Sequence, residues 1–339
     1  MPGDLTTVLA AGSCGAFVLA AEPVTIPLLQ RAAAIDVPSL RSSHSVPTPR
    51  GGGAPIALGL VLAALLIHNA TAMTFAAAVA AFGAIGFADD LRGLPVRRRL
   101  LLQGAGAAAV AFLLIARTGL PPAAKAAAAV VVAVWVIGFV NAFNFMDGVN
   151  GISAAHALIG GAAYACLGAW RQDTFLVAVG AAVAVGALAF LPWNAVRARV
   201  FLGDVGSYGL GAALAVLAAC AVLGGVPVEA ALGPVALYLA DTAWTLQRRI
   251  RCGESWLEPH RTHTYQRLCD AGWSHQRVTL ATGTVTSSLS LLGAASLTGH
   301  PVLRAAADVA AIGLLAAYLR SPVLLARIRA VRTQATCAP

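Results

Sequence analysis

Charged residues are scarce in this chain of 339 residues: Asp, Glu, Lys and Arg together make up only 11% of it. Hydrophobic residues make up 59% and occur in long runs over the whole length, so the mean hydropathy is high, at +0.79. This composition is that of a polytopic membrane protein and excludes an ordinary soluble domain. We therefore expect an all-α integral membrane protein with about 10 to 11 transmembrane helices.

Three other features are missing. The six cysteines include no CxxC pair, which argues against a disulfide framework and against a zinc knuckle. The segment Met1–Thr7 contains no basic residue, so we expect no cleavable signal peptide. No inverted internal repeat is visible, although such repeats mark many transporters.

Apolar segments that could cross a membrane are distributed along the whole chain. A helix needs about 20 predominantly apolar residues to cross the hydrocarbon core of a bilayer. Eleven candidate spans lie near residues 5–30, 54–68, 71–88, 100–117, 124–143, 151–170, 173–193, 206–225, 227–246, 277–297 and 302–320.

The basic residues test this arrangement, because cytoplasmic loops should hold most of the Lys and Arg. If the N-terminus lies outside, 19 of the 23 Lys and Arg residues fall on the inner side, and only Arg117, Lys125, Arg171 and Arg304 remain outside. We therefore expect the N-terminus outside and the C-terminus inside. The net charge of +9 then reflects topology and contact with anionic membrane lipids, so we expect no nucleic-acid partner.

The sizeable polar segments, near 31–53, 89–99, 194–205 and 247–276, all fall on the inner side. We expect a single membrane-embedded domain over residues 1–320, with these segments as its cytoplasmic loops, followed by a basic cytoplasmic tail over residues 321–339. Most of the unusual polar residues lie in or beside these loops.

The first inner loop reads DVPSLRSSHSVPTPRGGG, from Asp36 to Gly53. Composition alone allows a solvated connector. The alternative is a functional loop in which Arg41, His44 and Arg50 contact phosphate while the glycine backbone approaches a ligand closely.

The second inner segment begins GFADD, with Asp89 and Asp90 at the end of an apolar span. At least one carboxylate should lie at the membrane interface, where ionisable groups are functional candidates by default. Adjacent residues of a helix point about 100° apart, so both acids need not face one ligand. The alternative is that the pair only marks the interface.

The stretch NAFNFMDGVNG places Asn141, Asn144 and Asp147 at positions i, i+3 and i+6, on one face if the preceding helix continues. Amides beside a carboxylate provide hard oxygen ligands and donors that suit a magnesium-bound phosphate. The alternative is hydrogen bonding by asparagine between packed helices.

Two further motifs follow. In FLGDVGSYGLG, Asp204 stands between glycines just before a span, where it could bind a metal or a diphosphate, or simply cap the helix. In EPHRTHTYQRL, His260 and His263 flank Arg261. Zinc would need three to four ligands, and no third Cys or His has suitable spacing, so this motif fits a pyrophosphate better.

The acids Asp89, Asp90, Asp147 and Asp204 of these motifs all fall on the inner side of the membrane. Independent structural roles would scatter acidic residues over both sides. We therefore expect one site at the inner membrane face.

The five blocks, in order from Asp36 to Leu268, resemble the polyprenyl-phosphate N-acetylhexosamine-1-phosphate transferases. This family includes the lipid I synthase of peptidoglycan assembly (MraY-like) and the WecA-type enzymes that start O-antigen and related glycans. The resemblance implies a multi-pass protein of the bacterial inner membrane whose active site faces the cytoplasm. It implies transfer of a sugar-1-phosphate from a UDP-amino sugar to undecaprenyl phosphate, with release of UMP.

The resemblance also implies a cofactor and residue roles. Mg²⁺ is expected, with Mn²⁺ as a substitute, and a homodimer is a candidate assembly. Asp204 and Asp89 would be metal ligands, and Asp89 and Asp90 would activate the lipid phosphate or place the metal. The substrate-binding residues would be Arg50, Asn141, Asn144, Asp147, His260, Arg261 and His263.

Two mechanisms remain open. In one, the lipid phosphate attacks the β-phosphorus of the donor directly; in the other, an aspartate attacks first and forms a phosphosugar-enzyme intermediate. We favour direct attack, because an ionised lipid phosphate is already a competent nucleophile.

The donor is indicated by departures from the family pattern. Asn150 stands where many relatives carry a second aspartate. Asparagine keeps an oxygen ligand but removes a charge, which bears on metal affinity or donor preference. The histidine motif lacks the run of adjacent histidines of the lipid I synthases. The loop RSSHSVPTPRGGG is closer to the O-antigen initiating branch, so we expect UDP-GlcNAc or a deoxy-amino sugar as the donor.

Three other interpretations of the sequence remain open. The first is a phospho-MurNAc-pentapeptide transferase of peptidoglycan synthesis. The second is a transporter or lipid flippase, which should place ionisable groups near mid-membrane, whereas the motif acids here lie at span ends. The third is an inactive scaffolding homologue, and the intact motif acids argue against it.

Overall fold

The computed structural model describes residues 2–38, 46–255 and 260–336 and is 80% helical, which confirms the all-α polytopic fold class. In this described part the strands are β1 (Ile35–Asp36) and β2 (Thr48–Pro49), which pair antiparallel with Ile35 opposite Pro49. The helices are α1 (Pro2–Arg31), α2 (Ala54–Leu65), α3 (Ala70–Arg92), α4 (Val96–Ile115), α5 (Pro122–Phe145), α6 (Ile152–Arg171), α7 (Thr174–Asn194), α8 (Gly203–Leu223), α9 (Val228–Leu232), α10 (Ala236–Arg251), α11 (Thr264–Asp270), α12 (His275–Ala294) and α13 (Pro301–Thr336), with 3₁₀ turns η1 (Gly233–Val235) and η2 (Ala295–Thr298).

Nine of the helices in the described ranges are long and apolar enough to cross a membrane. Nine of the eleven predicted spans coincide with them, and the other two differ in length. The span expected at 54–68 is the 12-residue α2, and the span expected at 227–246 is divided into α9, η1 and α10. Pro234 lies in η1 at this division, and proline removes a backbone donor from a helix interior.

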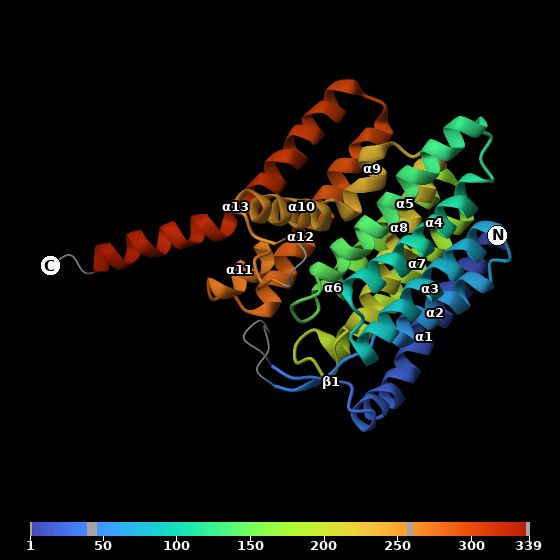
Figure 1. Ribbon diagram of the computed structural model, residues 1–339. Coiled ribbons are helices and arrows are strands. Elements are labelled where there is room, and N and C mark those ends of the chain that lie inside the picture. Colours follow the sequence, from blue (N-terminus) through green and yellow to red (C-terminus); the bar gives the residue numbers. More distant parts are fainter. Residues whose placement is uncertain (1, 39–45, 256–259, 337–339) are drawn as a thin grey trace.

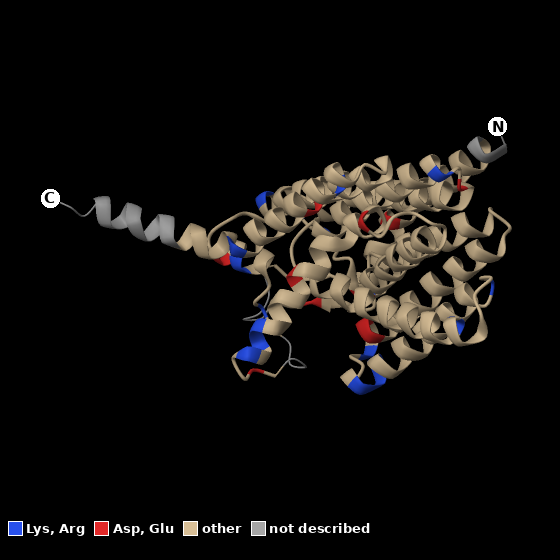
Figure 2. Ribbon diagram, turned by 90° about the horizontal axis from the view of Figure 1, so that it is seen from above, with Lys and Arg blue, Asp and Glu red and all other residues tan. Residues whose placement is uncertain are grey.

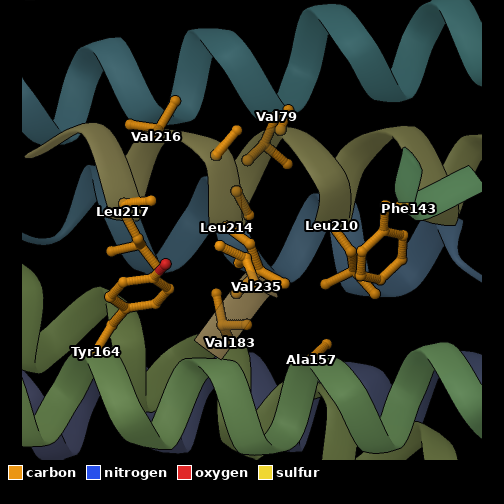
Figure 3. Packing of buried hydrophobic residues seen from close by; sticks show 14 of the residues in the cluster. Val79, Phe143, Ala157, Tyr164, Val183, Leu210, Leu214, Val216, Leu217 and Val235 are labelled. Atoms are coloured by element: carbon orange, nitrogen blue, oxygen red, sulfur yellow. The ribbon is translucent and has the colours of Figure 1, made fainter. Parts of the chain in front are cut away.

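Helix α8 lies at the centre of the bundle, with 89% of its most apolar 18-residue window buried. It packs against α3, α5 and α6, and Figure 3 shows Leu210, Leu214 and Leu217 of α8 among side chains of these neighbours. Because α8 is apolar all round and rich in glycine and alanine, other helices can approach it closely on every side.

Glycines bring the ends of three helices into backbone contact. A Cβ atom added to Gly86 of α3 would lie 2.1 Å from the carbonyl oxygen of Asp204 at the start of α8. A Cβ atom added to Gly53, just before α2, would lie 2.1 Å from the Cα of Gly206. Any side chain at Gly53 or Gly86 would force these helices apart, so glycine is required for this packing.

The glycine-rich loop before α2 docks on the segment before α8. The N–H groups of Gly51 and Gly52 donate to the carbonyl oxygen of Phe201, over 3.1 and 2.9 Å, and the Gly53 N–H donates to Leu202 over 2.8 Å. In return, the Phe201 N–H donates to the carbonyl oxygen of Pro49 over 2.8 Å. Two of the predicted inner loops, near 31–53 and 194–205, are therefore joined.

The later helices α9 to α13 lie beside the bundle formed by α1 to α8, next to α6 (Figure 1). Most of the ribbon of the long helices carries no charge, and charged residues collect near helix ends and connections (Figure 2). The predicted boundary between domain and tail at residue 320 falls inside α13, whose candidate membrane span extends to Ala326.

Candidate active site

One arginine joins two of the predicted acids. Arg50 Nε lies 2.5 Å from Asp90 Oδ1, and Arg50 Nη2 lies 2.6 Å from Asp204 Oδ2. Burial by itself would lower the pKa of the Arg50 guanidinium, but the carboxylates of Asp204 and Asp90 raise it above its usual value. The three residues come from a loop, from the end of α3 and from the start of α8, and together they form one charged cluster.

Asp90 acts mainly as a link between α3 and α8. Its Oδ1 accepts from the Asp204 N–H and its Oδ2 from the Val205 N–H, both over 2.9 Å. Its side chain is only 3% exposed. These are backbone donors of the first turn of α8 that have no partner within the helix, so Asp90 caps α8 from a neighbouring helix.

Asp204 is the most accessible acid of the cluster, with its side chain 18% exposed. Asn144 Nδ2 donates to Asp204 Oδ1 over 2.8 Å and contacts Ser207 Oγ at 2.9 Å. The sequence motifs NAFNF and FLGDVGS therefore meet at this point. The expected N-cap role does not apply, because Asp204 lies inside the first turn and Leu202 occupies the cap position.

Asp89 points away from this cluster, as the 100° separation of adjacent helical residues allows. Its Oδ1 accepts from the Leu94 N–H over 2.8 Å, and its Oδ2 accepts from Tyr208 Oη over 2.9 Å and from Arg99 over 3.3 Å. Both oxygens are thus engaged by protein donors, and the residue is 6% exposed. This geometry favours a role in holding the α3–α4 turn against α8.

A cavity of about 560 Å³ lies beside the cluster, between α4, α5, α10 and α11. It brings together five of the residues predicted to bind substrate. They are Asn141, Asn144, Asp147, His260 and His263. Because Asn144 both lines the cavity and bonds to Asp204, it connects the cavity to the charged cluster.

Asn141 also makes the helix-to-helix contact that was the alternative for this motif. Its Nδ2 donates to Gln103 Oε1 of α4 and to the carbonyl oxygen of Ile137, each over 2.8 Å. Asn141 therefore holds α5 against α4, and it also lines the cavity.

Burial perturbs the acid and one histidine of the cavity wall. Burial is the main reason why the pKa of Asp147 is raised to about 7, and the negative charge of Asp204 adds to it. The pKa of His260 is lowered to about 4, first by burial and then by the neighbouring His263 and Arg249. At neutral pH His260 therefore offers a ring N–H and a lone pair, but no charge.

His260 and His263 stack, with their ring centroids 5.0 Å apart. His263 is 2% exposed and stands at the N-cap position of α11, and its Nδ1 lies 3.4 Å from Oδ1 of Asp241. Arg261 lies between them in the sequence but does not line the cavity. Its Nη2 instead pairs with Asp270 Oδ1 over 3.0 Å. Arg41 and His44 of the first loop lie outside the described residues.

Asp241, Gln103 and Tyr265 were not among the predicted site residues. Tyr265 Oη donates to the carbonyl oxygen of Phe145 over 3.0 Å, at the end of α5. Asp241 could have been found, because it is the only acid between Glu229 and Glu254 and lies inside the predicted span 227–246, where an ionisable residue is a functional candidate. Gln103 and Tyr265 carried no such signal.

The carboxylate oxygens of the acid cluster are suitable ligands for a magnesium ion. In the described ranges, no group of three or more His, Cys, Asp or Glu is arranged to hold a metal ion. Mg²⁺ in phosphate-transferring sites, however, is commonly bound by one or two carboxylates together with substrate phosphates and water. Asp204 and Asp90 already hold one cationic group, the Arg50 guanidinium, between them, so the pair fits such an ion.

Comparison with known proteins places the chain in a family. Residues 72–222 match glycosyl transferase family 4. The chain is 28% identical over 278 residues to the probable undecaprenyl-phosphate N-acetylglucosaminyl 1-phosphate transferase of Bacillus subtilis (strain 168). The matched residues cover 76% of each of the two chains. It is 31% identical over 292 residues to the decaprenyl-phosphate N-acetylglucosaminephosphotransferase of Mycolicibacterium smegmatis, which covers 74% of this chain and 72% of that relative.

A phospho-N-acetylmuramoyl-pentapeptide-transferase of Symbiobacterium thermophilum is also similar, at 31% identity over 250 residues that cover 63% of this chain and 75% of the relative. Both branches named by the sequence resemblance are therefore represented among similar proteins. The chain belongs to glycosyl transferase family 4, within the group of polyprenyl-phosphate sugar-1-phosphate transferases that its motifs resemble.

Proposed function

We propose that this membrane protein transfers an N-acetylhexosamine-1-phosphate from a UDP-amino sugar to undecaprenyl phosphate, releasing UMP. The observation that carries the proposal is the connection, through Asn144, of the cavity with the cluster of Asp90, Asp204 and Arg50. Relatives whose names specify this kind of transfer support it.

The reaction joins two anionic phosphates, so the site must offset their repulsion. In direct transfer, a lipid phosphate oxygen bonds to the β-phosphorus of the donor while the bond from that phosphorus to the oxygen of UMP breaks. Asp204, the most accessible acid of the cluster, would hold Mg²⁺ with Asp90 beside it, and Mn²⁺ is the expected substitute. The ion would neutralise charge on the phosphates when bound.

The remaining residues bind and orient the reactants. Arg50 keeps its charge at any physiological pH and can pair with a phosphate oxygen in place of a carboxylate. Asn144 and Asp147 line the cavity beside the cluster and would contact the nucleotide diphosphate. His260 and His263 lie on the same cavity wall and would bind the diphosphate from the α11 side.

The proposed donor is UDP-GlcNAc or a deoxy-amino sugar, and the proposed product is the first lipid-linked intermediate of a surface glycan such as O-antigen. The departure at Asn150 has little bearing on the donor, because this residue is anchored to α12 and does not line the cavity. Its carbonyl oxygen accepts from Thr279 Oγ1 over 2.9 Å. UDP-MurNAc-pentapeptide is the second candidate donor, since a relative of that type is equally similar in identity.

The proposed location is the bacterial inner membrane, with the cavity at the cytoplasmic surface. The motif acids stand at helix ends, where a water-soluble nucleotide sugar and a membrane-bound lipid phosphate can meet. The acceptor would approach from the membrane, and the donor from the cytoplasm.

The test uses protein purified in detergent with undecaprenyl phosphate, Mg²⁺ and a panel of UDP-amino sugars that includes UDP-MurNAc-pentapeptide. We expect UMP release and lipid-linked product with one donor, abolished by chelation of divalent ions. Asp204→Asn should lower kcat by at least about a hundredfold, as removal of a group that stabilises transition-state charge does in other enzymes. Asp308→Asn on α13, the same chemical change away from the cavity, should leave kcat unchanged. No product from any donor with folded protein would refute the proposal.

A further inference from the structure

A buried carboxylate outside the sequence motifs holds one of the cavity histidines. Asp241 of α10 is 0% exposed. Its Oδ1 accepts from the Thr264 N–H over 3.0 Å and from Thr245 Oγ1 over 3.2 Å, and lies 3.4 Å from His263 Nδ1. Its Oδ2 accepts from Tyr318 Oη of α13 over 2.9 Å.

This set of contacts determines how the His263 ring is held. Three donors surround Asp241, from Thr245, Thr264 and Tyr318, and an ionised carboxylate can only accept hydrogen bonds. A hydrogen bond between His263 Nδ1 and this carboxylate therefore requires the hydrogen on Nδ1. Among the described residues, His263 is also the only basic side chain within ion-pair distance of Asp241.

The second ring nitrogen is then left for the cavity. The two nitrogens of an imidazole flank Cε1 and point in widely different directions, so fixing Nδ1 on Asp241 directs Nε2 away from that carboxylate. His263 lines the cavity together with Asp147 and Asn144. Stacking against His260, with centroids 5.0 Å apart, restricts rotation of the ring further.

We propose that Asp241 is a positioning residue for His263: it fixes the ring with hydrogen on Nδ1 and presents Nε2 to the diphosphate of the sugar donor. The proposal rests on the proposed transferase function and adds a residue to it. A phosphate oxygen bound at Nε2 requires a hydrogen there, so the ring in the complex carries hydrogen on both nitrogens, and the Asp241 carboxylate balances its charge.

The contacts of Asp241 extend this arrangement to three helices. Thr264 begins α11, so the same oxygen that holds the His263 ring also holds the start of the helix that follows it. Tyr318 brings α13 onto the other oxygen. The ring is thereby placed by the packing of α10, α11 and α13 and not by the histidine motif alone.

A double-mutant cycle distinguishes positioning from a general structural role. Asp241→Asn, His263→Gln and the double variant are purified as full chains, and UMP release is measured at varied donor concentration. Each single variant should lower kcat/KM about tenfold to a hundredfold, mainly through the KM of the donor. The double variant should match His263→Gln alone, because Asp241 acts only through that ring. Losses that multiply would overturn the proposal.

A second measurement needs no activity and uses a variant only to assign the signals. In wild-type protein with ¹⁵N-labelled histidine, the nitrogen chemical shifts of His263, identified by their loss in His263→Gln, report which nitrogen carries hydrogen. Hydrogen on Nδ1 is expected, and a bare Nδ1 with hydrogen on Nε2 would overturn the assignment. If wild-type protein transfers no sugar, the transferase proposal fails, yet this measurement still decides the arrangement of Asp241 and His263.

Discussion

At the scale of single residues, the site depends on how charges are paired. Arg50 lies between Asp90 and Asp204, so a single cation offsets two carboxylates that would otherwise repel each other. Arg50 and a divalent ion are therefore alternative partners for the same oxygens. This competition has a measurable consequence for stability.

We expect Arg50→Gln to lower the thermal unfolding midpoint in chelator, because two neighbouring carboxylates lose their counter-charge. Added Mg²⁺ should then raise the midpoint of this variant by several degrees more than that of wild type, because a ligand that binds the folded state stabilises it. Arg92→Gln, at the exposed end of α3, is the control and should respond to Mg²⁺ as wild type does. Equal Mg²⁺ responses of Arg50→Gln and wild type would contradict this pairing.

The raised pKa of Asp147 makes a second prediction at this scale. Its usual value is 3.8, and burial raises it to about 7 in the folded protein. The stabilisation that this group provides is fully present below pH 3.8 and is lost as the pH rises to about 7, because ionisation is then easier in the unfolded chain.

Asp147→Asn removes that titration, since the amide stays neutral. Between pH 5 and pH 8, wild type should therefore lose more thermal stability than the variant does. Differential scanning fluorimetry at the two pH values, in one detergent and at constant ionic strength, measures the difference. Parallel pH profiles for the two proteins would show that Asp147 is not held in a buried state.

At the scale of secondary-structure elements, the site depends on close approach of α3 and α8. Gly86 permits this approach, because an added Cβ would lie 2.1 Å from the carbonyl oxygen of Asp204. The same contact sets the distance over which Asp90 reaches the N–H groups of α8. Separating the two helices would therefore disturb both the packing and the acid cluster.

We expect Gly86→Ala to lower the unfolding midpoint and to reduce kcat at least about tenfold, because backbone atoms must move to admit the methyl group. Gly104→Ala on α4 is the matched control: it is also a helical glycine, and nothing lies within 4 Å of an added Cβ. That change should be neutral or slightly stabilising, since alanine favours helix. Similar effects of both substitutions would contradict the proposed contact.

At the scale of the whole molecule, the arrangement in the membrane is still a prediction from charge. The α3–α4 connection should lie inside the cell and the α4–α5 connection outside. In a variant whose native cysteines are replaced, Gly119→Cys should react with a membrane-impermeant maleimide in intact spheroplasts. Arg98→Cys should react only after the membrane is broken. The reverse pattern would invert the topology and place the cavity on the outer face.

Much of the fold could be predicted from the sequence. Hydropathy located nine of the membrane-length helices, because a long apolar segment in lipid has few alternatives to a helix. It overestimated the length of the segments at 54–68 and 227–246, where hydropathy cannot detect a short helix or a break at Pro234. Local spacing also placed Asn141 and Asn144 on the same cavity, because both belong to α5 and helical periodicity sets their separation. Asp147 lines that cavity too, but α5 ends at Phe145, so the chain after the helix places it there and not the helical spacing that was expected.

By itself, the sequence determined that the protein is an all-α membrane protein, which family it resembles, and that its motif acids share one end of the helices. Only the tertiary structure decided that Asp90 and Asp204 share Arg50, that Asp89 faces Tyr208, that Arg261 pairs with Asp270, and that Asp241 holds His263. The physical reason is that composition and helical periodicity act within a segment. The rotation and depth of one helix against another are set by side-chain packing between segments far apart in the chain.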